Sequence, residues 1–209
     1  MKVVAIKGSP RKNGNTEFAL NVVGNALLEE GIDFEIIDIG GKYIRGCIAC
    51  NKCSENRDGK CSISTDMLNS SLVKMKDADG IIISSPVYYS GIAGTMKCFL
   101  DRAFYVASVN GGWFRHKAGA SVVAVRRTGG SMTFNALNHY LSIAEMIIPS
   151  SNYWNVIHGL APGDAAGDDE GIQIMKMLGK NMAWILKMRD RSKDIEPGQA
   201  EKIFTNFIR

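Results

Sequence analysis

Short apolar runs alternate along the chain with longer stretches in which apolar residues recur at helical spacing. The runs are rich in valine and isoleucine and predict strands at residues 3–6, 34–39, 81–83, 120–125 and 153–157. The stretches between them have the spacing of helices with one buried face. Strands that alternate with helices in this way are typical of a parallel sheet covered on both faces. The pattern therefore predicts an α/β fold, a doubly wound five-stranded parallel sheet with helices on both faces.

Capping residues and breaks place the ends of the helices. The main helices are expected over residues 17–30, 65–77, 92–103 and 131–144. Thr16 is the expected N-cap of the first, and Gly31 follows its end as a natural C-terminal stop. A longer helix is expected to open at Asp168-Asp169-Glu170, because carboxylates stabilise the positive end of a helix dipole.

Length and composition indicate a single domain. The chain has 209 residues, 45% of them hydrophobic, which is enough for one core and short for two. We expect one domain over residues 1–209, with a cysteine-rich loop at 46–61 and a C-terminal helical extension from about residue 168. Residues 196–209 predict a terminal helix, packed on its own domain or on a second subunit. Its apolar face would consist of Ile203, Phe204, Phe207 and Ile208.

Charge and hydropathy exclude two classes of partner. The chain carries 25 basic and 21 acidic residues, a formal net charge of +4, with no long basic run, so nucleic acid is not expected as a partner. No apolar run approaches the roughly 18 residues that predict a membrane span, and the chain enters a strand directly after Met1. We expect a cytoplasmic protein.

A polar turn follows the first predicted strand and opens the first helix. It runs GSPRKNGNT from Gly8 to Thr16. Such a turn can offer backbone N–H groups, hydroxyls and the helix dipole to one bound anion, and Arg11 can add a bidentate contact. The alternative is an ordinary strand-to-helix loop. The turn lacks the G-x-G-x-x-G spacing of dinucleotide sites, so a terminal phosphate such as that of FMN fits it better than a pyrophosphate.

Two further loops should meet this turn, because ligands of doubly wound folds bind at the carboxyl ends of the strands. The loop after the third strand contains SSPVYYSG, residues 84–91, which supplies a stiff turn and two aromatic rings suited to a flavin ring. The loop after the fourth contains RRTGG, residues 126–130, with Arg126 and Arg127 as candidate partners for the negative charge of a reduced flavin. Trp113 is expected at the rim of this site.

These three motifs, in this order along the chain, resemble the NAD(P)H-dependent FMN reductases of the flavodoxin-like superfamily. The resemblance spans residues 2 to about 160. It implies FMN as cofactor, NAD(P)H as co-substrate, and commonly a homodimer or a higher homo-oligomer. It further implies that the phosphate is held by Ser9, Arg11, Asn15 and Thr16. The flavin ring would be held by Pro86, Val87, Tyr88, Tyr89 and Ser90, and approached by Arg127, Gly129 and Gly130.

Four of the five cysteines lie within fifteen positions, and they are Cys47, Cys50, Cys53 and Cys61. Thiols at steps of three plus a fourth nearby suit an iron-sulfur cluster better than zinc, whose knuckles are usually further apart. The segment also resembles the compact cysteine motif of iron-sulfur flavoproteins, in which a four-iron four-sulfur cluster passes electrons to FMN. Cysteines that bind nothing and a zinc site are the alternatives. Cys98 is expected to be a small buried hydrophobe.

The leading hypothesis is an FMN-dependent oxidoreductase that takes hydride from NAD(P)H and reduces a small-molecule acceptor such as a quinone, a nitro compound or a flavin. One alternative is an iron-sulfur flavoprotein that accepts electrons from ferredoxin, and another is a non-enzymatic electron carrier of the flavodoxin type. His116, His139 and His158 lie far apart in the sequence, so neither a catalytic triad nor a histidine metal site is expected.

Overall fold

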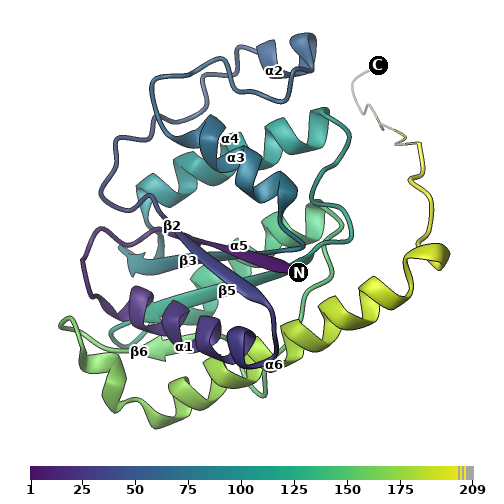
Figure 1. Ribbon diagram of the computed structural model, residues 1–209. Helices are drawn as coiled ribbons and strands as arrows, with labels where there is room; N and C mark the ends of the chain where they lie inside the picture. The colour runs from purple at the N-terminus through teal and green to yellow at the C-terminus, as the bar shows by residue number, and fades with distance from the viewer. Residues whose placement is uncertain (202, 204, 206–209) are drawn as a thin grey trace.

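The computed structural model describes residues 1–201, 203 and 205 as one layered α/β unit. Figure 1 shows its elements in chain order. The strands are β1 (Lys2–Lys7), β2 (Asp33–Asp38), β3 (Gly80–Tyr88), β4 (Gly91–Ile92), β5 (Ala118–Val125) and β6 (Val156–His158). The α-helices are α1 (Asn15–Glu29), α2 (Lys52–Asn56), α3 (Leu68–Asp77), α4 (Gly94–Val109), α5 (Gly130–Ile143) and α6 (Asp169–Arg191). Two short 3₁₀ helices span Asp164–Gly167 and Lys193–Ile195.

Five parallel strands form the sheet in the order β2-β1-β3-β5-β6, and the short β4 pairs antiparallel with the end of β3. The strand order reverses between β1 and β3, which pair directly with Val4 opposite Ile81. Such a reversal leaves a crevice at the carboxyl edge of the sheet. The predicted doubly wound, flavodoxin-like arrangement is therefore confirmed.

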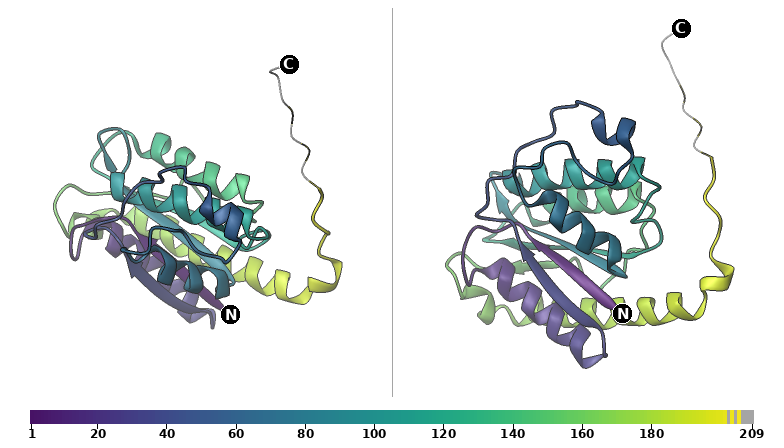
Figure 2. Two further views of the ribbon diagram at one scale, coloured as in Figure 1. Left: turned by 90° about the horizontal axis from the view of Figure 1, so that it is seen from above. Right: turned by 45° about the horizontal axis from the view of Figure 1, so that its top comes forward.

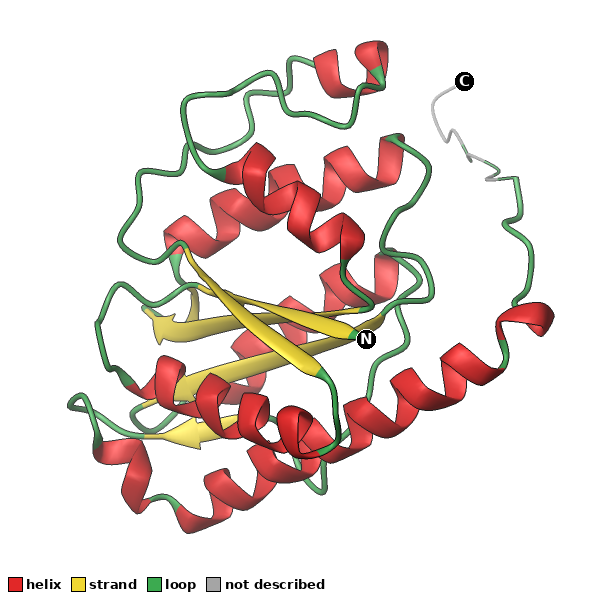
Figure 3. Ribbon diagram, in the orientation of Figure 1, coloured by secondary structure: helices red, strands yellow, loops and turns green. Residues whose placement is uncertain are grey.

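Helices cover both faces of the sheet, as Figure 3 shows. On one face, α1 and α6 enclose a core with the alanine and valine side chains of β1 and β5. On the other, α3, α4 and α5 pack on the alternate residues of the same strands. Burial on both faces explains why β1 and β3 are continuously apolar over residues 3–6 and 81–83, all of them fully buried.

Local interactions shift several elements from their predicted ends. The edge strand β6 is shorter than predicted because Tyr153 lies in a turn, where its carbonyl accepts a hydrogen bond from the Ser151 hydroxyl. The helix expected from Thr65 begins at Leu68, whose N–H is bonded to the carboxylate of Asp66 at 3.2 Å. Side-chain hydrogen bonds of this kind stop a helix locally without any change in its apolar periodicity.

The cysteine-rich segment lies outside the helical layer, over α4, on the side of the molecule away from α1 and α6 (Figure 2). It contains the one-turn helix α2, which its sequence did not predict. Trp113 lies here, with the ammonium group of Lys76 4.6 Å from its ring centre, so its expected place at the rim of the flavin loops is wrong. Gly59 of the cysteine segment packs against the same ring.

Residues 196–201, which follow the second 3₁₀ helix, are not helical, so the helix predicted from Glu196 is wrong over this part. The segment is fixed to the loop after α4 by Arg115, which donates to the carbonyls of Pro197 and Gly198 at 3.0 Å. Ile203 is exposed. The other residues of the predicted apolar face, Phe204, Phe207 and Ile208, lie outside the described residues. Within the part of the chain that the structure describes, no helix is both long and apolar enough to cross a membrane.

Candidate functional site at the carboxyl edge of the sheet

The turn between β1 and α1 presents an open helix N-terminus. Helix α1 begins at Asn15, and Gly14 is its N-cap, so the expected cap at Thr16 is wrong. Asn13 has φ of 51°, which turns the chain, and Gly14 then enters the helix in an extended conformation. A glycine cap has no side chain to occupy the N–H groups of the first turn, which are unpaired within the helix. The turn therefore retains donors for an external anion.

Close packing fixes the shape of this turn. Gly8 donates its N–H to the carbonyl of Ser84 at 2.9 Å, and the Ser9 hydroxyl accepts from the N–H of Arg11 at 3.3 Å. Gly40, after β2, lies so close that a Cβ atom on it would be 2.0 Å from the carbonyl oxygen of Ser9. The side chains of Ser9 and Thr16 are both buried within the turn.

An ion-pair network lies beneath the turn. Lys7, the last residue of β1, is only 3% exposed and contacts the carboxylates of Glu17 at 2.8 Å and Asp38 at 2.9 Å. Burial lowers the pKa of Lys7, but its bonds to these carboxylates outweigh burial and the net pKa is raised. Glu17 also accepts from the N–H of Asn13. Because the Glu17 charge is neutralised in this way, it opposes a bound anion less than a free carboxylate in the first helical turn would.

Arg11 and Asn15 join the turn to the segment after β6. The guanidinium of Arg11 donates to the carbonyl of Leu160 at 2.7 Å. The Asn15 side-chain oxygen accepts from the N–H of Ala165 at 3.2 Å, and its amide group lies against Gly159. Sequence reasoning missed this neighbour, because residues 149 and 150 positions apart are involved.

The second loop is a tight hairpin. Strand β3 continues through Tyr88, and Tyr89 and Ser90, with φ of 44° and 71°, form the turn to β4. Positive φ at both central residues is typical of a type I′ hairpin. Tyr89 is fully exposed at the tip, whereas Val87 is half-buried below it. Pro86 still pairs with Ala124 of β5, so the hairpin projects from the middle of the sheet.

The third loop meets this hairpin. Gly129, with φ of 88°, is the N-cap of α5, and a Cβ atom there would lie 3.1 Å from Cγ1 of Val87 and 3.9 Å from Cα of Ser90. Gly130 packs equally closely on Val156 of β6. The structure thus places the second and third loops in contact, and the first loop beside the end of β3 through Gly8. The predicted residues of all three loops lie at one edge of the sheet.

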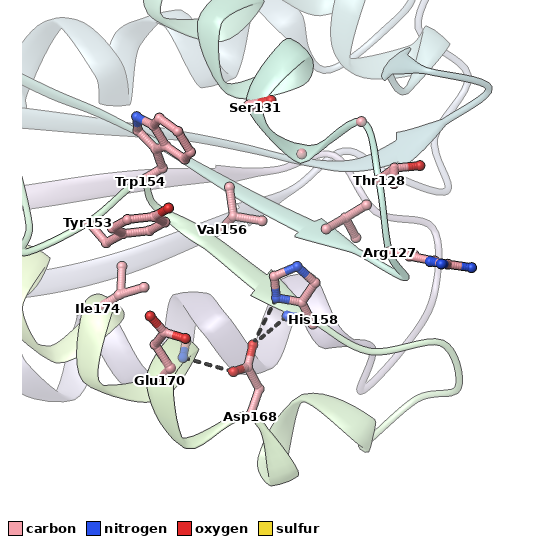
Figure 4. A pocket seen from close by; sticks show the side chains of 14 residues that line it. Arg127, Thr128, Ser131, Tyr153, Trp154, Val156, His158, Asp168, Glu170 and Ile174 are labelled. Carbon is pink, nitrogen blue, oxygen red and sulfur yellow. Dashed lines mark hydrogen bonds and ion pairs between the residues drawn. The ribbon is translucent and has the colours of Figure 1, made fainter.

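A cavity of about 340 Å³ lies beside the third loop, between the N-termini of α5 and α6. Figure 4 shows Arg127 at one end and the rings of Tyr153 and Trp154 at the other. The two rings are 4.9 Å apart between centres. Its size is that of a small-molecule site, and its walls combine aromatic surface with a few polar groups.

His158 and Asp168 form a pair in the wall of this cavity. The carboxylate of Asp168 accepts from the His158 backbone N–H at 2.7 Å and lies 3.3 Å from Nδ1 of its ring. Its other oxygen caps α6 by accepting from Gly171 N–H at 2.9 Å, as the dashed lines in Figure 4 show. The predicted acidic start of the long helix is confirmed. Its N-cap, Asp168, contacts His158, which lies ten positions earlier in the chain.

The four clustered cysteines line one small cavity, which is closed on its inner side by α4. Cys47 and Cys50 are exposed, Cys61 is half-buried and Cys53 is buried. Among the residues that the structure describes, no three histidine, cysteine or acidic side chains are arranged to hold a metal ion. The four thiols line the same cavity, and their side chains would have to move closer together to ligate one bound group. Cys98 is half-buried rather than buried, beside Gly46.

The environments of Cys50 and Cys53 differ in a way that alkylation can measure. The hydroxyl of Ser62, 3.1 Å from the sulfur, lowers the pKa of Cys50, whereas burial, followed by the nearby Cys61, raises the pKa of Cys53. Because the thiolate is the nucleophile, iodoacetamide should label Cys50 at least several-fold faster than Cys53 in the reduced, metal-free protein at pH 7. Peptide mass spectrometry after timed quenching checks this order.

A control variant separates the hydroxyl from simple exposure. Ser62→Ala should slow the labelling of Cys50 and leave that of exposed Cys47 unchanged. Equal labelling rates for Cys50 and Cys53 in the parent protein would contradict the assignment.

The fold is that of a flavodoxin-like α/β protein in which three loops meet at the carboxyl edge of the sheet. A model of the NADPH-dependent FMN reductase family matches residues 1–161, and the chain belongs to this family of FMN-binding oxidoreductases.

Comparisons with individual proteins agree with this assignment. An iron-sulfur flavoprotein of Methanocaldococcus jannaschii is 39% identical over 195 residues, covering 90% of this chain and 98% of that protein. Among solved structures, a flavodoxin from the domain Archaea matches with a TM-score of 0.60 at 17% identity, covering 90% of this chain and 99% of that one. RosB, solved with bound 8-demethyl-8-formylriboflavin-5′-phosphate, matches with a TM-score of 0.72 at 13% identity, covering 100% of this chain and 92% of that one. The two structures support the fold.

Proposed function

We propose that the three loops hold FMN and that the protein passes electrons from NAD(P)H, through the flavin, to a small-molecule acceptor. The observation that carries this proposal is the convergence of the three loops at the carboxyl edge of the sheet. Gly8 is bonded to Ser84 at the end of β3, and Gly129 packs on the Val87–Ser90 hairpin. Family membership makes FMN the ligand to be placed there.

The first loop would hold the phosphate. Its open helix N-terminus at Gly14 and the hydroxyls of Ser9 and Thr16 supply donors and a favourable dipole for a dianion. Arg11 uses one N–H group on Leu160 and retains others for the phosphate, since a guanidinium has five. Asn15 would hold the segment after β6 against the phosphate loop, because its side-chain oxygen accepts from the N–H of Ala165.

The second and third loops would hold the flavin ring. The hairpin of Pro86, Val87, Tyr88, Tyr89 and Ser90 forms one side, and Gly129 and Gly130 allow the backbone to approach from the other. The second substrate would enter by the cavity beside the third loop, where Trp154 offers a half-exposed ring for stacking. The expected homodimer stays a prediction.

FMN, when bound, supplies the hydride and electron-transfer chemistry, so the protein is required to orient it and to stabilise charge. Arg127 is the candidate for charge stabilisation, because it lines the cavity, whereas Arg126 of the same loop does not. A guanidinium close to the pyrimidine end of the ring favours the negatively charged reduced form.

We further propose that Cys47, Cys50, Cys53 and Cys61 ligate a four-iron four-sulfur cluster. The donors suit iron, they share one cavity, and a relative that is 39% identical is named an iron-sulfur flavoprotein. A cluster would open a second route, in which electrons arrive one at a time from a protein donor such as ferredoxin. Zinc and a cysteine segment without metal are the competing outcomes.

Anaerobic reduction of the FMN-loaded protein tests the source of electrons. NADPH or NADH should bleach the flavin absorbance stoichiometrically, and Arg127→Gln should slow this step by about tenfold, the loss of one charge contact of about 1.4 kcal/mol. Arg126→Gln is the matched control and should react at the parent rate.

Failure of both pyridine nucleotides, with full bleaching by reduced ferredoxin, would reject the hydride route and favour the second one. Equal slowing in Arg126→Gln and Arg127→Gln would contradict a specific role for Arg127.

A further inference from the structure

Arg102 on α4 is a buried arginine, 1% exposed, that faces the cysteine segment. Its Nε–H donates to the sulfur of Cys61 at 3.3 Å. Nη1 donates to the carbonyl of Arg45 at 3.0 Å and Nη2 to that of Ile63 at 2.9 Å. Both terminal nitrogens also contact the carboxylate of Asp66. A guanidinium has five N–H donors, so every donor is used and one of them is directed at a cysteine sulfur.

This network joins the two ends of the cysteine segment. Arg45 precedes its first thiol, Cys61 is its last, and Asp66 follows it. Asp66 is 1% exposed on its side chain, so the charges of the pair are compensated away from water. Burial raises the pKa of Asp66, but its bonds to Arg102 and the Leu68 N–H outweigh burial and the net pKa is lowered.

Stability alone does not account for such a pair. Apolar residues of similar volume at a buried ion-pair position are often as stable or more stable, because both charges must be desolvated. A guanidinium with all donors used does what an apolar side chain cannot: it holds two backbone carbonyls, those of Arg45 and Ile63, and places a positive charge at one sulfur. That sulfur is the last of the four clustered thiols, in the wall of the cavity they share.

We propose that Arg102 is a positioning residue for the iron-sulfur cluster, which it serves by fixing Cys61 and by raising the reduction potential of the cluster. The inference rests on the proposed cluster. Hydrogen bonds and positive charge at a ligand sulfur stabilise the more negative, reduced state of a cluster, and burial of the donor strengthens the effect. Sequence reasoning missed Arg102, because it lies 41 positions from Cys61 on a helix assigned to the core.

Arg57 provides a matched control within the same segment. It carries the same charge within the same cysteine segment, but it is exposed and its Nε donates to the carbonyl of Ser54 at 3.4 Å. An exposed charge is screened by water and salt, so its removal should change the potential little. Any difference between Arg102 and Arg57 therefore measures the buried guanidinium, through its hydrogen bond and its unscreened charge, rather than the net charge of the protein.

The test is an anaerobic redox titration of the full-length protein with dithionite, in which electron paramagnetic resonance follows the reduced cluster. Arg102→Met should lower the reduction equilibrium constant about tenfold, a shift of about 59 mV to more negative potential for one electron. The cluster of Arg57→Met should have the same reduction potential as that of the parent protein. Iron and FMN content per chain are measured on the same samples.

A measurement on the parent protein covers the case in which Arg102→Met fails to fold. With ¹⁵N-labelled arginine, pulsed electron paramagnetic resonance of the reduced cluster should detect coupling to a guanidinium nitrogen, and Arg57→Met should retain it. Absence of this coupling overturns the inference, as does an iron-loaded Arg102→Met variant with the parent potential. Absence of iron from the anaerobically prepared parent protein overturns the proposed cluster instead, and the inference with it.

Discussion

Gly40→Ala is expected to weaken FMN binding by at least about 100-fold, an effect of about 2.7 kcal/mol. The new Cβ would lie 2.0 Å from the carbonyl oxygen of Ser9 and 2.6 Å from the nitrogen of Pro10, which no L-residue tolerates. The backbone of the phosphate turn must therefore move. Hydrogen bonds to a charged group are worth about 1.5–3 kcal/mol each, so misplacement of two donors suffices for the predicted loss.

Gly41→Ala is the matched control, because a Cβ atom on Gly41 has no neighbour within 4 Å among the residues that the structure describes. Titration of apoprotein into FMN, followed by quenching of flavin fluorescence, gives both dissociation constants. Thermal unfolding of the two apoproteins shows whether the loss is local to the turn. Equal affinities for the two variants would exclude the turn beside Gly40 as the phosphate site.

Cys53→Ser is expected to lower the bound iron of anaerobically prepared protein by about tenfold or more. Loss of a partner that only supports a ligand already costs about 10–100-fold in metal affinity, and Cys53 would be a ligand itself. It is the buried thiol of the four and lies at the centre of the motif, so the replacement changes one atom in a closed environment. Counts of iron, zinc, acid-labile sulfide and FMN per chain provide the measurement.

Cys98→Ser should retain the parent iron content, because Cys98 lies on α4 and does not line the cavity of the other thiols. Loss of iron in this variant would show that the ligand set differs from the one proposed. Zinc in place of iron and sulfide would reject the cluster, and FMN without any metal would support thiols that bind nothing.

Much of the candidate site could be predicted because its parts are local in sequence. The polar turn from Gly8 to Thr16 follows directly on a buried strand, and the hairpin and the Gly129-Gly130 pair follow two others. Parallel strands bring their carboxyl ends to one edge, so their order along the chain was enough to place the loops together. The helix cap was misplaced at Thr16 because a glycine cap carries no side-chain signal.

Other parts could not be predicted, because they join residues far apart in the chain. The contact between Gly40 and Ser9 depends on how β2 pairs with β1, and Lys7 contacts Asp38 for the same reason. No periodicity or motif identifies these partners, since each residue alone is typical of a strand end or a helix start.

The sequence by itself determined the alternation of strands and helices, the three loops and the group of four thiols, because hydrophobic periodicity, glycine positions and cysteine spacing are all local properties of the sequence. Only the tertiary structure decided which groups a buried charged side chain contacts. Nothing in the sequence distinguishes Arg102 from the other residues of its helix, and packing of α4 under the cysteine segment directs its donors to Cys61 and Asp66. The physical reason is that a buried guanidinium must find a partner for every donor, and those partners lie far away in sequence.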